Sequence, residues 1–275
     1  MQRRLFTSLL AAGLAFAGAA QADQLADIKQ KGQIVIGVLG TDEPNSFLDP
    51  KTRELVGYEV DLGQAIAKKL GVKPVFKQIA VAARIPELQQ GHVDLLAASL
   101  THNKEREAQI DFSLTTFVTG QKALVKKASG VKDVPELAGK RVLTAKGGTQ
   151  EPNIKKAVPT AEVVTYENSQ QAFLALQQGK GVAYVNDELS LFVDIAKLGP
   201  KGADYVMLPM NLSVEPLALG IKKGETGLKA VVDETLRELE KAGGGEKLYM
   251  KWFGPNTKTN SPTRTFKFET DKIAG

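Results

Sequence analysis

The stretch LAASLTHNKERE changes from a strand-like apolar run to hydroxyl residues and then to a charge cluster. Ser99 and Thr101 supply hydroxyls, and Arg106 follows within one or two helical turns. An arginine offers a planar fork of donors that matches a carboxylate, and nearby hydroxyls can donate to the same carboxylate or accept from an ammonium. The pattern indicates half of a site for a small charged molecule. The alternative is a solvated helix face on which Arg106 forms surface ion pairs.

Two later stretches have complementary chemistry. TAKGGTQE passes from a strand-like run through two glycines to Thr149, where backbone N–H groups and a hydroxyl at a helix N-terminus suit an anion. AYVNDE ends another strand-like run at Asp187, whose carboxylate can bind an ammonium. For both residues a plain helix cap is the alternative. A carboxylate site together with an ammonium site predicts an α-amino acid as the ligand.

No catalytic signature is found in the sequence. It has no cysteine, no Gly-x-Ser-x-Gly, no phosphate-binding loop of the Walker type and only two histidines, His92 and His102. We therefore expect no catalytic residue, no metal and no cofactor. The formal net charge is +5 and the basic residues are spread along the chain, so nucleic acid is not an expected partner.

The first 22 residues have the pattern of a secretory signal peptide. Arg3 and Arg4 precede an apolar run over 9–16, and the small-residue motif AQA ends at Ala22, after which we expect cleavage. The alternative, a membrane anchor, would need about 20 apolar residues. Without cysteine there is no lipid-modified N-terminal cysteine either. The sequence predicts a periplasmic protein with no membrane insertion after signal cleavage.

The elements that must position the charged residues alternate between strands and helices. The strand-like runs are 34–38, 74–76, 93–97, 120–125, 141–144, 162–165 and 182–185. The helix-like stretches are 58–70, 84–90, 169–178, 228–241 and 246–252, with further helix starts at Asn103 and Thr149. This alternation predicts an α/β fold with two mainly parallel sheets flanked by helices. Ser99, Thr149 and Asp187 then lie at carboxyl ends of strands, the usual ligand edge of such sheets.

A restart of the pattern near 129–137 indicates a second lobe. We predict a signal peptide over 1–22, a first lobe from 23–119 and 214–275, and a second lobe over 120–213. Extended runs near 118–124 and 213–219 would be the two hinge crossings, with the ligand in the cleft between the lobes. One continuous doubly wound sheet is the alternative. The polar tail from Asn256 is expected to lie on the surface or to be partly disordered.

The mature chain resembles the periplasmic amino-acid-binding proteins of bacterial ABC importers, in their polar-amino-acid class. The most specific matching stretch is GYEVDLGQAIAKKL, followed by RIPELQQGHVDLLAASLT, IDFS, GTQE and KWFG. SLTHNKER, FVTGQKALVKK and FKFE make it most similar to the glutamate/aspartate-binding branch. The resemblance implies a type II periplasmic-binding-protein fold. It also implies a monomeric binding protein, not an enzyme, that closes on an amino acid and delivers it to an inner-membrane ABC permease.

The resemblance also implies roles for single residues. The α-carboxylate clamp of the family falls on Arg106, helped by Thr101 and Thr149, and its ammonium site falls on Asp187 with Ser99. A further residue, Arg84, matches an arginine that meets the side-chain carboxylate in members with acidic ligands. This match favours glutamate or aspartate as the ligand.

Other pocket positions depart from that branch. Leu39 and Val81 stand where it has a second arginine and a serine, Ser169 stands where it has a histidine, and the aromatic residue that often covers the ligand is missing from EPNSF, residues 43–47. Another polar amino acid therefore remains an alternative. So do an exported cyclohexadienyl or arogenate-type dehydratase on the same fold and a ligand-loaded partner of a chemoreceptor.

Overall fold

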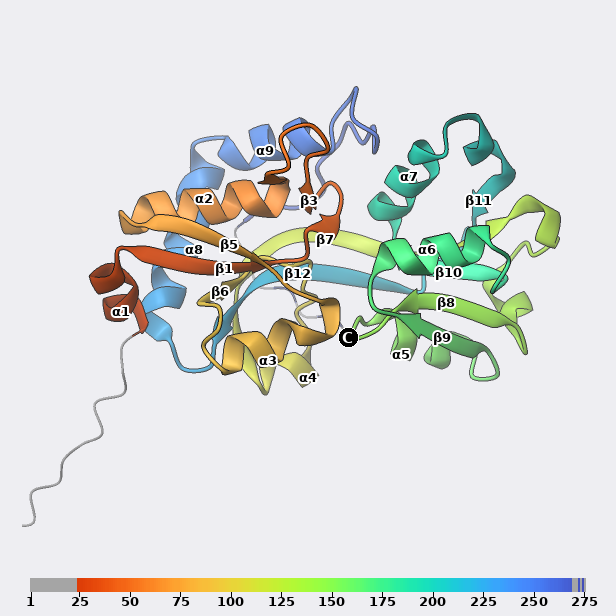
Figure 1. Cartoon of the computed structure of the whole chain (residues 1–275), viewed down its shortest axis with the longest axis horizontal. Helices are drawn as coiled ribbons and strands as arrows, with labels where there is room; N and C mark the ends of the chain where they lie inside the picture. The colour runs from red at the N-terminus through yellow and green to blue at the C-terminus, as the bar shows by residue number, and fades with distance from the viewer. Residues whose placement is uncertain (1–23, 269–271, 273, 275) are drawn as a thin grey trace, which may run out of the picture.

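The computed structural model describes residues 24–268, 272 and 274. Two units of strands and helices lie side by side, and two long strands run from one unit to the other (Figure 1). We call the unit that contains the N-terminal strands the first lobe and the other unit the second lobe. No helix within the described part of the chain is long and apolar enough to cross a membrane. The predicted signal peptide, 1–22, lies outside the described residues.

The first lobe is built on parallel strands covered by helices. Strand β1 (Gln33–Val38) pairs in parallel with β5 (Lys73–Gln78) and with β6 (Leu95–Leu96). The helices of this lobe are α1 (Gln24–Lys31), α2 (Tyr58–Leu70), α3 (Arg84–Gln89), α4 (Lys104–Glu107), α8 (Thr226–Lys241) and α9 (Gly244–Trp252). A small antiparallel sheet follows β1 and comprises β2 (Thr41–Asp42), β3 (Ser46–Leu48) and β4 (Leu55–Val56). The apolar faces of these elements form two buried clusters of their own.

The second lobe repeats the arrangement. Strand β8 (Arg141–Ala145) pairs in parallel with β9 (Glu162–Tyr166) and β10 (Ala183–Asp187). Its other elements are α5 (Gln150–Ala157), α6 (Ser169–Gln177), α7 (Glu188–Lys197) and β11 (Tyr205–Met207). Two further buried clusters hold this lobe together, so each lobe has its own core. The lobe boundaries at 119/120 and 213/214 remain a prediction.

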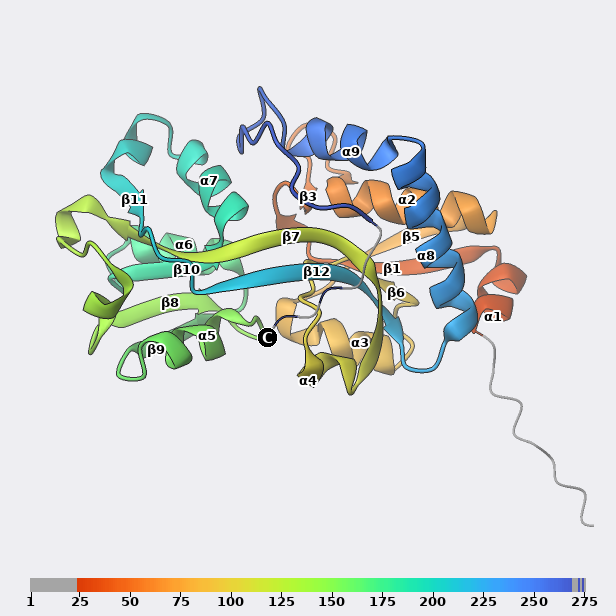
Figure 2. The same ribbon diagram turned by 180° about the vertical axis from the view of Figure 1, so that it is seen from behind.

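The two crossings are strands that hydrogen-bond to each other. Strand β7 (Ile110–Lys126) pairs antiparallel with β12 (Ser213–Lys222), and both pass from one lobe to the other (Figure 2). As a result, the main strands of both lobes form one hydrogen-bonded path, β5-β1-β6-β12-β7-β10-β8-β9, where two separate main sheets were expected. The reason is that backbone N–H and C=O groups of the crossings need partners, and each crossing supplies them to the other. Strand β11 pairs with β7 beside this path, and β2, β3 and β4 remain a separate small sheet.

Helix α2 connects the loop after β1 to the rest of the first lobe. The hydroxyl of Tyr58 donates to the carbonyl of Thr116 at 2.7 Å, and Asp61 accepts from the indole N–H of Trp252 at 2.7 Å. Gly57, just before the helix, has φ 139°, and a Cβ there would lie 2.2 Å from the carbonyl oxygen of Asn45. Only glycine fits this approach, so the stretch GYEVDLGQAIAKKL holds the loop that contains Asp42 against the lobe.

The C-terminal segment packs into the first lobe, which corrects the expectation of a surface tail. Phe266 and Phe268 are buried in the larger core cluster of that lobe. The guanidinium of Arg264 stacks on both rings and pairs with the Glu240 carboxylate through two bonds of 2.8 and 2.7 Å. The polar composition of the segment hid the alternation of these two aromatic residues with charged ones. Figure 2 shows the segment after α9 running beside β7, where the ring centroids of Phe266 and Phe117 are 4.7 Å apart.

Candidate ligand-binding site

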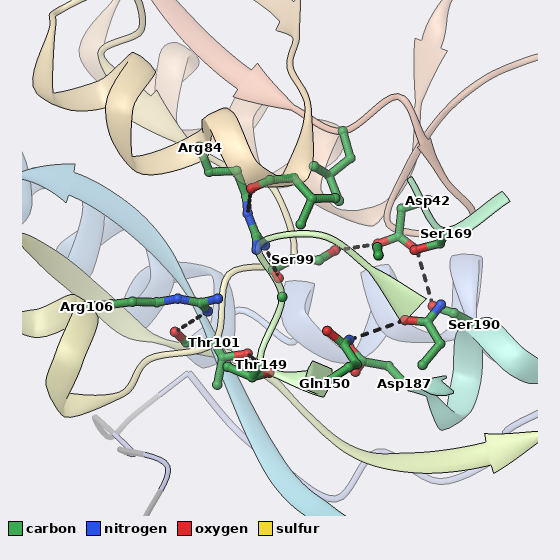
Figure 3. Close-up of a pocket in the computed structure, with 15 residues that line it drawn as sticks. Asp42, Arg84, Ser99, Thr101, Arg106, Thr149, Gln150, Ser169, Asp187 and Ser190 are labelled. Carbon is green, nitrogen blue, oxygen red and sulfur yellow. Dashed lines mark hydrogen bonds between the residues drawn. The ribbon is translucent and has the colours of Figure 1, made fainter. Parts of the chain in front are cut away.

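A small cavity lies between the two lobes and is lined by residues of both. All six residues predicted for the ligand line it, namely Arg84, Ser99, Thr101, Arg106, Thr149 and Asp187. Figure 3 shows Arg106, Thr149 and Asp187 on one side of Ser99, and Arg84 and Asp42 on the other. The structure therefore brings together residues that lie up to 103 positions apart in the sequence.

Arg106 supplies a buried cation at the first-lobe wall of the cavity. It lies in the single turn of α4, which Asn103 caps by accepting the Arg106 backbone N–H at 2.9 Å. Its guanidinium donates to the carbonyl of Thr101 at 3.0 Å and to that of Gly147 at 3.2 Å. A guanidinium has five N–H donors, so others remain for an anion within the described site. The solvated-face alternative is wrong, because only 8% of Arg106 is exposed.

Asp187 supplies the opposite charge on the second-lobe wall. It stands between β10 and α7, and its side chain makes no capping hydrogen bond to that helix. The buried atom Oδ1 has no hydrogen-bond partner among the described residues. Burial, followed by the nearby Glu215 and Asp42 carboxylates, raises the pKa of Asp187 well above its usual value. A buried acceptor without a donor is costly, so this position is suited to a ligand donor such as an ammonium.

Ser99 lines the cavity in a strained backbone conformation. Its φ is 49°, which a non-glycine residue rarely adopts. The Ser99 N–H donates to Glu59 Oε1 at 2.7 Å and its carbonyl accepts from Arg84 at 2.8 Å. Its hydroxyl donates to Asp42 Oδ2 at 2.5 Å. Glu59 is buried, and burial raises its pKa to about 8. Such strain persists only where neighbouring groups impose it, and it is common at ligand sites.

The two predicted threonines meet across the cavity. Their hydroxyl oxygens are 3.5 Å apart, so Thr101 and Thr149 face each other from different lobes. The Thr149 hydroxyl also accepts from Gln121 and donates to Glu215, both at 2.8 Å. It makes no capping bond to α5, so the simple helix-cap alternative is not what the structure shows. Because this hydroxyl is engaged with the crossing strands, an anion here would depend on N–H groups at the start of α5.

Arg84 is buried, and backbone carbonyls occupy most of its donors. Nε donates to Val81 at 2.8 Å, Nη1 to Ala98 at 3.0 Å and Ser99 at 2.8 Å, and Nη2 to Gly147 at 3.0 Å. Four of its five N–H groups are thus engaged within the described structure, which leaves one for a ligand. Arg84 therefore orders the cavity wall in addition to any contact with a ligand.

Residues 34–255 match the model of the bacterial extracellular solute-binding proteins, family 3. The chain belongs to this family. It is 33% identical over 234 residues to the glutamine-binding protein GlnH of an ABC transporter of Bacillus subtilis, with 84% of each chain covered. It is 32% identical over 271 residues to the glutamate/aspartate import solute-binding protein of Salmonella typhimurium, covering 91% of this chain and 88% of that one.

A solved structure confirms the predicted type II periplasmic-binding-protein fold of this solute-binding protein. The ancestral amino acid-binding protein AncCDT-1, described as a precursor of cyclohexadienyl dehydratase, superposes with a TM-score of 0.76 at 33% identity. The match covers 84% of this chain and 99% of that one. The predicted two-lobed fold is thus confirmed, although the main strands of both lobes are hydrogen-bonded into one sheet through the two crossings.

Several polar contacts join the lobes of the solute-binding protein around the cavity. The Gly147 carbonyl of the second lobe accepts from both Arg84 and Arg106 of the first. On the other side of the cavity, Ser190 donates to Asp42 Oδ1 at 3.2 Å. A ligand that contacts both walls stabilises this arrangement because only a closed form offers both walls at once.

Gly147 is expected to be required for closure. It has φ 82°, and a Cβ on it would lie 2.6 Å from Cα of Ala82 in the opposite lobe. We expect Gly147→Ala to weaken ligand binding by about 5- to 150-fold, because overpacking of this kind costs about 1–3 kcal/mol and acts only on the closed form. Calorimetry measures the affinity, and small-angle scattering measures the compaction caused by the ligand.

Gly139→Ala is the matched control for this experiment. Gly139 has φ 68°, so alanine there meets a similar backbone penalty, but its Cβ would have nothing within 4 Å. We expect this variant to lose some stability and to keep its affinity. Equal affinities for the two variants would contradict the role of Gly147 in closure.

The sequence did not single out three carboxylates that shape the site. Asp42 lines the cavity from the end of β2, Glu59 accepts the N–H of Ser99, and Glu215 on β12 accepts the hydroxyl of Thr149. Glu59 is the first acidic residue of the matching stretch on α2, but the sequence did not indicate what it binds. Asp42 and Glu215 belong to no recognisable sequence motif, because each contacts its partners only through the packing of distant segments.

Proposed function

We propose that this protein is the periplasmic receptor of an ABC importer. In this proposal, the monomer, released by cleavage after Ala22, binds a polar α-amino acid between its lobes. The closed form then docks on an inner-membrane permease. Family membership supports the solute-binding role, and the two relatives described above are a glutamine-binding and a glutamate/aspartate-binding transport protein.

One observation supports the amino-acid ligand more than any other. Two buried groups stand on opposite walls of one cavity, namely the Arg106 guanidinium and the Asp187 carboxylate. Among the described residues, Arg106 keeps unused N–H donors and Asp187 Oδ1 has no donor. An α-amino acid has an anionic and a cationic group on the same carbon atom, so it can satisfy both walls together. In our assignment, Arg106 with Thr101 and the start of α5 binds the α-carboxylate, and Asp187 with Ser99 binds the ammonium.

A thermal-shift screen of the twenty amino acids tests this function. A ligand at about 100 times its dissociation constant stabilises the native state by about 2.7 kcal/mol, which corresponds to roughly 5–10 °C for a chain of this size. We expect one or a few polar amino acids to give such a shift. A screen in which no amino acid changes the melting temperature would contradict the proposal.

A dehydratase is the second candidate function. The raised pKa of Asp187 would also suit a general acid, and one structural neighbour is described as a precursor of a cyclohexadienyl dehydratase. Turnover of a cyclohexadienyl acid decides between the two. Binding without turnover is the result that the importer proposal requires. Binding of the ligand-loaded protein to a chemoreceptor is compatible with the importer proposal.

The type of ligand side chain that can bind depends on Arg84 and on the other groups that line this part of the cavity. Glutamate or aspartate would place a carboxylate beside Arg84, as the resemblance implies. However, the described residues leave one N–H donor of Arg84 unused, and the Asp42 carboxylate lines the same cavity. These contacts support a polar amino acid and do not by themselves favour an acidic one.

A further inference from the structure

We infer that Asp42 and Arg84 form a side-chain subsite that selects a neutral carboxamide, as in glutamine or asparagine, over the corresponding acid. The inference rests on the proposed function, because it assumes that an α-amino acid occupies the cavity. Asp42 stands directly before residues 43–47, the segment from which the expected aromatic residue is missing. The role that we assign to Asp42 comes from its contacts in this structure.

Asp42 is fixed at the cavity from both lobes. Oδ2 accepts from the Ser99 hydroxyl at 2.5 Å and from Asn45 Nδ2 at 3.1 Å, and Oδ1 accepts from the Ser190 hydroxyl at 3.2 Å. A carboxylate has about four acceptor positions, so three donors leave room for one more. Figure 3 shows Asp42 between Ser99 and Ser190, near Ser169.

The unused capacities of Asp42 and Arg84 are complementary. After their hydrogen bonds to other described residues, Asp42 retains an acceptor position and Arg84 retains one N–H donor. A carboxamide offers an NH2 group to the carboxylate and a carbonyl oxygen to the guanidinium. Leu39 and Val81, which pack with Ala98 and Ala145, provide an apolar wall for the methylene groups of the side chain.

The charge balance of the cavity favours the same class of ligand. The α-carboxylate of the amino acid would pair with Arg106 and its ammonium with Asp187. The opposite charges of Arg84 and Asp42 then balance each other. A neutral side chain preserves this balance. An acidic ligand side chain would lie against the Asp42 carboxylate, and the guanidinium of an arginine ligand would lie against Arg84. Like-charge contacts of this kind are costly in a buried site.

Calorimetry with two isosteric pairs tests the inference on the mature protein. The pairs are glutamine with glutamate and asparagine with aspartate, and arginine is a cationic reference. We expect a carboxamide to bind at least about tenfold more tightly than its acid and more tightly than arginine. In Asp42→Asn, which keeps the shape and removes the charge, we expect the amide-to-acid ratio to fall by at least about tenfold. Asp204→Asn, at an exposed position far from the cavity, is the matched control and should keep the ratio.

The outcomes separate this inference from the proposed function. An acid that binds as tightly as its amide would overturn the inference and support the glutamate/aspartate prediction. Tighter binding of arginine, or of an amino acid outside both pairs, would overturn the carboxamide assignment while the importer proposal stands. An unchanged ratio in Asp42→Asn would remove Asp42 from the selection. Failure of every amino acid to bind would overturn both.

Discussion

Replacing Arg106 with alanine is expected to weaken amino-acid binding by about 30- to several-thousand-fold. The guanidinium is buried and is the cation that we assign to the α-carboxylate, so its loss leaves a buried anion without a partner. Loss of one partner of such a pair costs roughly 2–5 kcal/mol. Because every amino acid has an α-carboxylate, the loss should be similar for all ligands, whatever their side chain. Calorimetry on the purified protein measures it.

Arg141→Ala is the control for this variant. Arg141 lies on β8 with an exposed side chain, pairs with Glu162 at 3.1 Å and does not line the cavity. An exposed ion pair of this kind contributes little to the free energy of unfolding. The affinity and the stability should therefore stay close to those of the unmodified protein. Affinity close to that of the unmodified protein in a folded Arg106→Ala variant would contradict the assignment of the carboxylate clamp.

Replacing Asp187 with asparagine is expected to weaken binding by at least about 30-fold and to remove a pH dependence. Without ligand, burial holds the pKa of Asp187 well above its usual value. A bound ammonium stabilises the ionised carboxylate, so the pKa of Asp187 falls on binding. Binding therefore releases a proton where the pH lies between the lowered pKa of the bound form and the raised pKa of the free form. It follows that affinity rises with pH and decreases, by up to about tenfold per pH unit, as the pH falls through that raised pKa.

Calorimetry at a series of pH values, in buffers of different ionisation enthalpy, measures both the affinity and the protons released. The Asp187→Asn variant cannot ionise at this position, so its weaker affinity should lack this component of the pH dependence. The exposed Asp204→Asn variant should keep the dependence of the unmodified protein. Proton release that is the same with and without the Asp187 carboxylate would contradict its assignment to the ammonium.

Local patterns in the sequence predicted the elements well. The helix expected over 58–70 is α2, Tyr58–Leu70, because its apolar residues repeat with the period of a helix that covers a sheet. Strand ends also predicted the location of the charged residues. Carboxyl ends of parallel strands meet at one edge of a sheet, so Ser99, Thr149 and Asp187 had to lie near the ligand edge of their lobes.

The sequence by itself thus determined the alternation of strands and helices, the family resemblance and the six residues that meet at the cavity. Only the tertiary structure decided how they are used. It showed that most N–H donors of Arg84 bind backbone carbonyls, and that Asp42 lines the same cavity. Hydrophobic periodicity reports which face of an element is buried. It does not report which polar groups become neighbours when two lobes pack, and the partners available to each donor and acceptor depend on that packing.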